Sequence, residues 1–337
     1  MCPYSATERR RKNNGCFEDS HQHIDFSRRP FRHCAGVVFA GIDRKIYARL
    51  QRRVGPPLYQ PYIDIIKLSQ KETVIPRTAN VTMFRLAPLI GFAGMLASIA
   101  IIPVTGIYSG LYQSGDLLVL LYLLSTPALA LVIGASASGS AYSSVGLSRE
   151  ITMVLAYEIP LLIVFLTAGM RVGMQSGGTA VFSLSGIMDF QLAKGPLLFD
   201  LPMLPAFIAL LICIPATIGV VPFDIPEAET EITEGPLLEY SGAGLAMFKM
   251  TGGLKMLVLS ALAVALFFPS GIGGFWLVNL LWFIVKCFIV LFFTITLVRA
   301  TRARMRLDQA YKFYLIVPTA LALISLVLTL CSVGTRV

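Results

Sequence analysis

Six carboxylic acids lie close together in the stretch GVVPFDIPEAETEITEGPLLEYSG, residues 219–242. They are Asp224, Glu227, Glu229, Glu231, Glu234 and Glu239. Carboxylates that crowd together raise one another's pKa, so such a group takes up or releases a proton when a nearby charge changes. The stretch therefore predicts a site that moves protons or ions.

Three of these glutamates have helical spacing. Glu227, Glu231 and Glu234 stand at i, i+4 and i+7, so a helical turn would place them on one face. Like charges at this spacing repel one another, and more strongly in a dry site. The nearby Pro222 and Gly235 favour a shaped turn over a solvated acidic loop. We expect the three glutamates to share protons.

Charged residues also interrupt the most apolar segments. Glu158 lies in EITMVLAYEIPLLIVFLTAG, Lys286 in FWLVNLLWFIVKCFIVLFFT and Lys255 in MTGGLKMLVLSALAV. A charge at the centre of a bilayer costs about 2.5–3.5 kcal/mol. Lys255 lies near a helix end and can reach the interface by snorkelling. We interpret Glu158 and Lys286 as parts of a proton or ion path, with Glu158 titrating together with the acidic stretch. The alternative is a structural ion pair or a polar contact between helices.

The elements that carry these residues are membrane helices. Hydrophobic residues make up 55% of the 337 positions, charged residues only 14%, and the mean hydropathy is +0.72. Apolar runs near the bilayer-spanning length of about 20 residues recur along the chain. They lie near 82–104, 117–137, 151–170, 203–221, 250–269, 274–299 and 312–332. Because lipid requires internally satisfied backbones and no alternating strand pattern occurs, we predict an all-α polytopic membrane protein with seven transmembrane helices.

Lysine and arginine predict the orientation of this bundle. Fifteen of them precede residue 82, whereas the next loop, 105–116, has none. The link 300–311 again carries three arginines. By the positive-inside rule, the cytoplasmic segments are the N-terminal segment with loop 43–81, and the loops 138–150, 222–249 and 300–311. The acidic stretch is thus predicted to face the cytoplasm.

The sequence lacks the usual residues for chemistry on a substrate. None of the six cysteines forms a C-x-x-C pair, and all three histidines lie within the first 33 residues. A membrane-embedded enzyme would need convergent His, Cys or Asp side chains, and no catalytic motif is present. We therefore predict no catalytic residue, metal ligand or cofactor in this chain.

Four segments, in order, resemble one known family. PFDIPEAETEITEGPLLEYSG resembles PFD-[LI]-PEAE…EYSG of the membrane subunit that anchors the hydrophilic arm of NADH–quinone oxidoreductase (respiratory complex I), a pattern shared by membrane-bound, energy-converting NiFe hydrogenases. FAGIDRKIYARLQRRVGPPLYQPYIDIIKLSQKE resembles the first cytoplasmic loop with its R-x-Q-R-R-x-G-P core, and AYEIP the S-Y-E motif at Glu158. LVRATRARMRLDQ resembles W-x-R-A-T-x-P-R-x-R-x-D-Q, with Lys286 near a lysine position upstream. The resemblance covers about residues 36–335.

The resemblance implies a role in coupling. In that family the subunit lies in the membrane under a hydrophilic arm, and its carboxylates begin a charged path into antiporter-like subunits. By analogy the six acids of the acidic stretch, with Glu158 and Lys286, form this path. A basic loop would seat the catalytic subunit, with phosphate or lipid binding as the alternative; its residues are Arg44, Lys45, Arg49, Arg52 and Arg53. The implied partners are iron–sulfur and large catalytic subunits, antiporter-like membrane subunits and lipids. No recognition fold for nucleic acid is visible.

One motif distinguishes the branches of the family. Quinone-using members read A-G-x-x-T-E-Y-S-G, whereas this chain reads TEGPLLEYSG with the additional carboxylate Glu234. This form resembles the hydrogenase-type branch, in which reduced ferredoxin is the donor, protons or sulfur compounds are acceptors, and partner subunits hold iron–sulfur clusters and a NiFe centre. The alternatives are a quinone-chamber subunit of complex I and a stand-alone ion transporter, although no internal repeat is apparent. The coupling ion is a proton or sodium, and the expected location is the plasma membrane of a prokaryote.

The N-terminus departs from the family. The family implies an eighth helix ending in FAGIDRK, but residues 1–35 are dense in charge and only CAGVVFAGI is apolar. Nine residues do not span a bilayer. We therefore expect a sequence error in residues 1–35, with a genuinely missing first helix as the alternative, ahead of a single membrane domain at 36–337. No function is assigned to the cysteines and histidines of this segment.

Overall fold

The computed structural model describes residues 36–108, 110, 116–176, 180–271 and 275–334. Within these residues the regular elements are helices, and no strand forms beyond isolated bridges. A first helix covers 36–50 of the described chain. The others are α2 (Gln60–Ser69), α3 (Val81–Ile101), α4 (Leu117–Ser138), α5 (Ala141–Ser176), α6 (Leu184–Lys194), α7 (Leu204–Ile218), α8 (Glu229–Ile232), α9 (Gly242–Phe267), α10 (Trp276–Leu291), α11 (Leu297–Thr301) and α12 (Leu307–Gly334), with short 3-10 turns at Leu197–Phe199, Leu201–Met203 and Gly235–Leu237.

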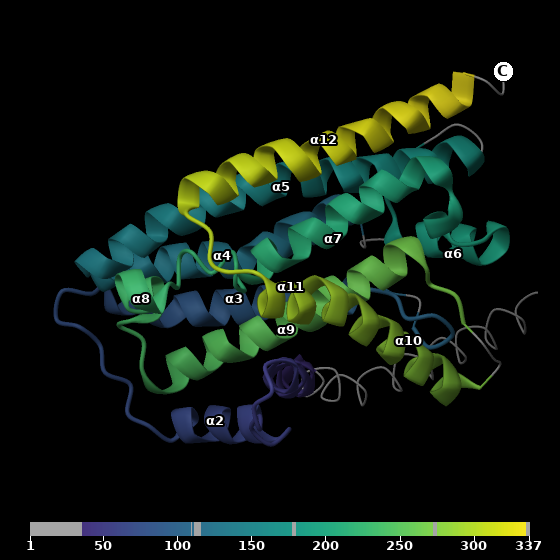
Figure 1. Ribbon diagram of the computed structural model, residues 1–337. Coiled ribbons are helices and arrows are strands. Elements are labelled where there is room, and N and C mark those ends of the chain that lie inside the picture. The colour runs from purple at the N-terminus through teal and green to yellow at the C-terminus, as the bar shows by residue number, and fades with distance from the viewer. Residues whose placement is uncertain (1–35, 109, 111–115, 177–179, 272–274, 335–337) are drawn as a thin grey trace, which may run out of the picture.

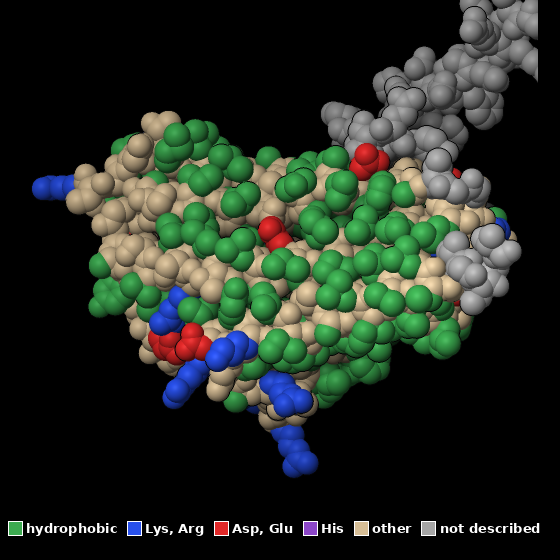
Figure 2. Space-filling model, turned by 90° about the horizontal axis from the view of Figure 1, so that it is seen from above, with side chains coloured by type: hydrophobic (Ala, Val, Ile, Leu, Met, Phe, Trp, Pro, Cys, Tyr) green, Lys and Arg blue, Asp and Glu red, His purple; other side chains and the backbone are tan. Residues whose placement is uncertain are grey.

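Seven helices of the described chain are long and apolar enough to cross a membrane, which confirms the prediction of seven. They are α3, α4, α5, α7 with its preceding turn, α9, α10 continued through a π-helical turn (Phe292–Thr296) into α11, and α12. The helices lie alongside one another in one bundle (Figure 1). Hydrophobic side chains cover most of the face seen in Figure 2, as expected for a surface in contact with lipid or other membrane subunits.

Small residues bring the central helices close together. A Cβ atom on Gly94 would lie only 1.8 Å from the hydroxyl oxygen of Thr126, and one on Gly91 would lie 3.0 Å from Ala130. Glycine therefore allows α3 and α4 to touch, a common device in membrane bundles. Helix α5 packs against α4, and α9 packs against α3.

The described part of the first helix packs into the same bundle. Phe39 stacks on Phe288 of α10 with ring centroids 4.1 Å apart, and a Cβ atom on Gly36 would lie 3.0 Å from the carbonyl oxygen of Gly253 in α9. The predictions made for residues 1–35, including a sequence error there, lie outside the described residues.

The segments predicted to face the cytoplasm meet at one end of the bundle. The Asn80 N–H donates to the carbonyl oxygen of Ala137 at 2.9 Å, and the Met305 N–H donates to that of Pro222 at 3.1 Å. In Figure 1 this end holds α8 and the starts of α5 and α12, opposite α6 and the C-terminus. That this end faces the cytoplasm stays a prediction.

Helix α5 extends into one of the predicted loops. It has 36 residues, about 54 Å at 1.5 Å per residue, against a hydrocarbon core of about 30 Å. Residues 141–150, predicted as part of a loop, form its first turns. Their polar side chains do not prevent helix formation because these turns lie beyond the apolar span. Arg149 and Glu150 consequently occupy fixed helical positions.

Candidate functional site

The acidic loop, residues 219–241, is held against the first turns of α5. A Cβ atom on Gly146 would lie 2.5 Å from Pro236, so only glycine permits this approach. The Ser143 hydroxyl donates to the carbonyl oxygen of Gly235 at 3.3 Å. These contacts fix the loop relative to the membrane helices, as a site with defined chemistry requires.

The prediction that three glutamates share a helical face is wrong. Helix α8 covers only four residues, and Glu227 precedes it. Glu234 follows it with a positive φ of 67°, in the left-handed region. The left-handed backbone at Thr233 and Glu234 ends the helix after one turn. Glu231 and Glu234 are exposed, whereas Glu227 is turned into the protein and only partly accessible.

Two arginines outside the loop neutralise two of its carboxylates. Arg149 of α5 contacts Glu231 at 2.5 Å, and Arg304 contacts Asp224 at 2.5 Å. Arg304 also donates to the Thr230 hydroxyl at 3.0 Å. Burial raises the pKa of Asp224, although the hydrogen bond from Arg304 opposes that shift. Neither arginine was singled out from sequence, since their pairing depends on three distant segments that meet only in the fold.

Glu227 has the strongest potential for proton exchange in the loop. Burial raises its pKa to about 8, and the negative charges of Glu150 and Asp224 contribute to that rise, while Lys255 opposes them. A carboxyl group with this pKa holds its proton at neutral pH and releases it after a modest change in local potential. Among the six acids, Glu227 therefore fits the predicted function best.

The remaining acids of the loop have less specialised surroundings. Glu229 is exposed and Glu239 is partly buried. The neighbouring Tyr240 stacks on Phe84 with centroids 4.1 Å apart and donates to its carbonyl oxygen at 3.1 Å. The EYSG motif thus anchors the end of the loop on α3.

Glu158 lies deeper in the membrane than the loop. Its side chain is partly exposed on α5, where it interacts with the Ser125 hydroxyl of α4. The combined titration of Glu158 with the loop glutamates stays a prediction. Since Glu158 lies well along α5 from the turns that hold the loop, such coupling needs groups between them.

The two intramembrane lysines bind main-chain carbonyls. Lys255 is 6% exposed and donates to the carbonyl oxygen of Thr217, at the C-terminal end of α7, at 2.8 Å. It therefore points into the protein and does not snorkel. Lys286 donates to the carbonyl oxygens of Phe268 and Ser270 at 2.8 and 2.6 Å, and to the Ser270 hydroxyl at 2.9 Å. All three N–H donors of its ammonium group are thus used.

These contacts favour a structural role for Lys286, which closes the C-terminal end of α9. We expect Lys286→Met to destabilise the protein, because each buried carbonyl left without a donor costs about 1–3 kcal/mol. Thermal unfolding in detergent measures the effect, with Lys312→Met at an exposed position of α12 as the control. Normal stability combined with lost ion movement would instead support the path role predicted from sequence.

The basic loop holds one ion-paired arginine and three exposed ones, of which Arg53 lies over the Tyr47 ring at 5.9 Å from its centroid. Arg44 contacts Asp64 of α2 at 3.4 Å, and Lys45 is partly buried. Arg49, Arg52 and Arg53 are exposed at the end of the first helix and the turn that follows. These three arginines are therefore the members of the predicted set best placed to contact another subunit.

A buried carboxylate near this loop was not selected from the sequence. Asp43 is 1% exposed, accepts a hydrogen bond from the Thr296 hydroxyl at 2.6 Å and lies 3.6 Å from Arg299. Thr296 ends the π-helical turn, a feature that often occurs at functional positions. The acid inside the apolar FAGIDRK segment was a signal that could have found it.

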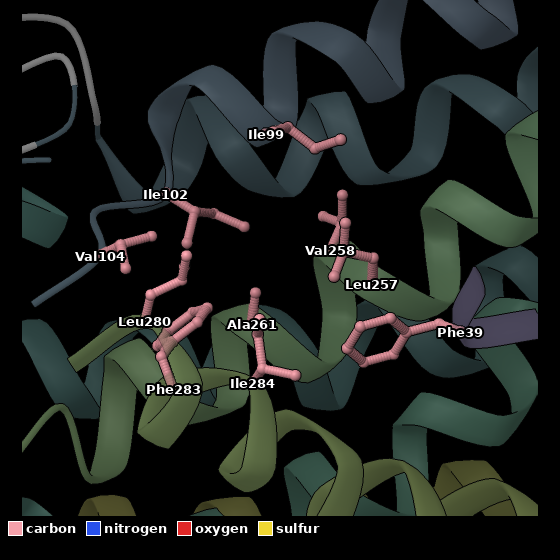
Figure 3. A pocket seen from close by; sticks show the side chains of 10 residues that line it. All are labelled: Phe39, Ile99, Ile102, Val104, Leu257, Val258, Ala261, Leu280, Phe283 and Ile284. Atoms are coloured by element: carbon pink, nitrogen blue, oxygen red, sulfur yellow. The ribbon is translucent and has the colours of Figure 1, made fainter. Parts of the chain in front are cut away.

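An apolar pocket elsewhere in the bundle lacks groups for chemistry. It lies between the first helix, α3, α9 and α10 (Figure 3). Phe39, Ile99, Val258 and Phe283 are among its ten lining residues, all of which are hydrophobic. This pocket therefore offers no group for proton or ion transfer.

Comparison with known proteins gives a consistent result. The pattern of the family described as NADH dehydrogenase matches residues 31–330. The chain is 39% identical over 234 residues to hydrogenase-4 component C of Escherichia coli (strain K12), covering 69% of this chain and 71% of the relative. It is 36% identical over 276 residues to formate hydrogenlyase subunit 4 of the same strain, covering 80% and 87%.

A solved structure shares the fold. A chain from the membrane-bound sulfane sulfur reductase, an archaeal respiratory membrane complex, matches with a TM-score of 0.82 and 29% identity. The match covers 92% of this chain and 99% of that one. The similarity therefore extends over nearly the whole bundle and the acidic loop.

Proposed function

From the premise that the chain belongs to the NADH dehydrogenase family, we propose that it is the membrane-anchor and coupling subunit of a ferredoxin-dependent respiratory complex. The complex is of the hydrogenase type and reduces protons or a sulfur compound. In this role the chain links electron transfer in a hydrophilic arm to the movement of protons or sodium ions across a prokaryotic plasma membrane.

Similarity and motif form support this branch over the quinone-using one. The relatives described above include two hydrogenase-type components and a subunit of a sulfane sulfur reductase. The loop also carries Glu234 within the form TEGPLLEYSG. We accordingly assign the iron–sulfur clusters and a NiFe centre to partner subunits, with antiporter-like subunits beside this chain in the membrane.

The buried carboxyl group of Glu227 is the observation that carries the coupling role. It combines a pKa of about 8 with a position just before α8, at the end of the bundle that holds the starts of α5 and α12. A hydrophilic arm would bind at this end. Reduction of a nearby centre would change the local potential and shift the proton on Glu227. The loop is thus suited to convert an electron's arrival into proton displacement.

Purification from the native host tests the assignment. A tagged copy of this chain, extracted in mild detergent, should bring down subunits containing iron and nickel, and the preparation should oxidise reduced ferredoxin. Metal analysis and mass spectrometry identify these subunits. Recovery of this chain alone would contradict the proposal, and NADH-dependent quinone reduction would favour the complex I alternative.

A further inference from the structure

Helix α5 carries a second glutamate on the face that packs against the acidic loop. Ser143, Gly146, Glu150 and Tyr157 stand at i, i+3, i+7 and i+14, so they form one stripe along the helix. Ser143 and Gly146 contact the loop directly. Glu150, one turn farther along the stripe, consequently lies between the loop and the membrane interior.

Glu150 and Lys255 complete a cluster of charges around Glu227. Both residues act electrostatically on Glu227. The ammonium group of Lys255 in turn has Glu150 and Glu227 as its charged neighbours and is fixed by Thr217. The cluster therefore joins α5, α9 and the acidic loop, and it places a cation within electrostatic reach of two carboxylates.

Tyr157 connects this cluster with Glu158. The tyrosine is 3% exposed, and its charged neighbours are Glu150 and Glu158. Glu150 and Glu158 are eight residues apart, which corresponds to about 12 Å along the helix. Direct transfer of a proton over that distance is excluded, so a group with an exchangeable proton is needed between them, and Tyr157 has both carboxylates as charged neighbours.

We propose that Glu150 is a proton-carrying residue that links Glu227 to Tyr157 and Glu158, with Lys255 as its counter-charge. The inference rests on the proposed function. The protonated Glu227 gives one proton to the Glu150 carboxylate. Glu150 then gives one proton to the Tyr157 hydroxyl oxygen as that hydroxyl passes its own proton to the Glu158 carboxylate. No electron moves in these steps.

Each group around Glu150 has a defined part in this sequence. Lys255 faces it from α9 and stabilises the ionised form of either carboxylate. Glu227 faces it from the loop, and Tyr157 follows it on α5. The adjacent Arg149 is engaged by Glu231 and by the carbonyl oxygen of Ile225. The proton therefore has one acceptor on α5 near the loop, which is Glu150.

The test is ion uptake per electron in vesicles that contain the complete complex. In Glu150→Gln, proton transfer should slow about a hundredfold, the loss typical for a removed proton carrier. Glu150→Asp should recover part of the uptake because it keeps the carboxyl group. Asp189→Asn, at an exposed position of α6, is the control and should behave as wild type.

Thermal unfolding in detergent separates proton transfer from folding. Glu150→Gln keeps Lys255 and its hydrogen bond to the carbonyl oxygen of Thr217, so the variant should assemble and unfold near the wild-type temperature. Normal uptake in Glu150→Gln, or no recovery in Glu150→Asp, would overturn the inference. Glu227→Gln distinguishes failure of this inference from failure of the proposed function, because normal uptake in that variant would contradict the proposed function itself.

Discussion

Replacing Glu227 with glutamine is expected to abolish most ion uptake while the complex still assembles and accepts electrons. Glutamine keeps the shape and much of the hydrogen bonding of the side chain but carries no exchangeable carboxyl proton. The effect should be large because Glu227 has a pKa of about 8 and interacts electrostatically with Glu150 and Lys255. Turnover should slow if electron transfer stays coupled to ion movement.

The raised pKa of Glu227 also predicts the direction in which stability and ion uptake change with pH. The pKa of Glu227 is raised from 4.5 to about 8, so the folded protein binds more protons than the unfolded chain between these values. The associated stability is present below pH 4.5 and is lost as the pH rises through about 8. Wild-type uptake should fall over the upper part of this range, because the protonated donor disappears.

Both statements are tested by measuring ion uptake and turnover in vesicles between pH 6 and about 9, around the midpoint expected for Glu227. Glu72→Gln, at an exposed position between α2 and α3, is the matched control. A wild-type decline near pH 8 that persists in Glu227→Gln would assign the titration to another group. Full uptake in the variant would leave the loop as a docking surface.

The second large effect is expected from the exposed arginines that follow the first helix. Replacing Arg49, Arg52 and Arg53 together by glutamine should release the hydrophilic arm from the membrane fraction. These side chains are exposed at the end of the first helix and in the turn that follows it. Charge complementarity steers and orients such contacts, and removing one side of a desolvated charge pair costs about 2–5 kcal/mol.

The triple variant needs a control of equal charge. Replacing Lys67, Lys71 and Arg77 by glutamine removes three positive charges from the same segment without touching the arginine-rich turn. Sedimentation of membranes at rising salt, followed by detection of arm subunits, compares the two. Equal release in both variants would show a general charge effect, and retention in both would contradict the docking role.

The sequence by itself determined the membrane class, the seven spans of the described residues and the acidic composition of the loop. Seven apolar runs are enough to predict seven membrane-spanning helices, because a segment of about 20 apolar residues in lipid forms a helix whatever its neighbours. The six acids and the basic residues on alternate loops can also be recognised from the sequence alone. These properties depend on composition and local spacing, which do not require knowledge of the fold.

The tertiary structure decided which of these carboxylates are paired by arginines and which turn into the protein. Glu231 and Asp224 are paired by arginines from other segments, whereas Glu227 turns inward toward Glu150 and Lys255. Helical spacing had suggested one face for the glutamates, but left-handed backbone at Thr233 and Glu234 ends α8 after a single turn. Burial and pairing arise from residues far apart in the chain, so the pKa of a carboxyl group depends on contacts that only the folded bundle creates.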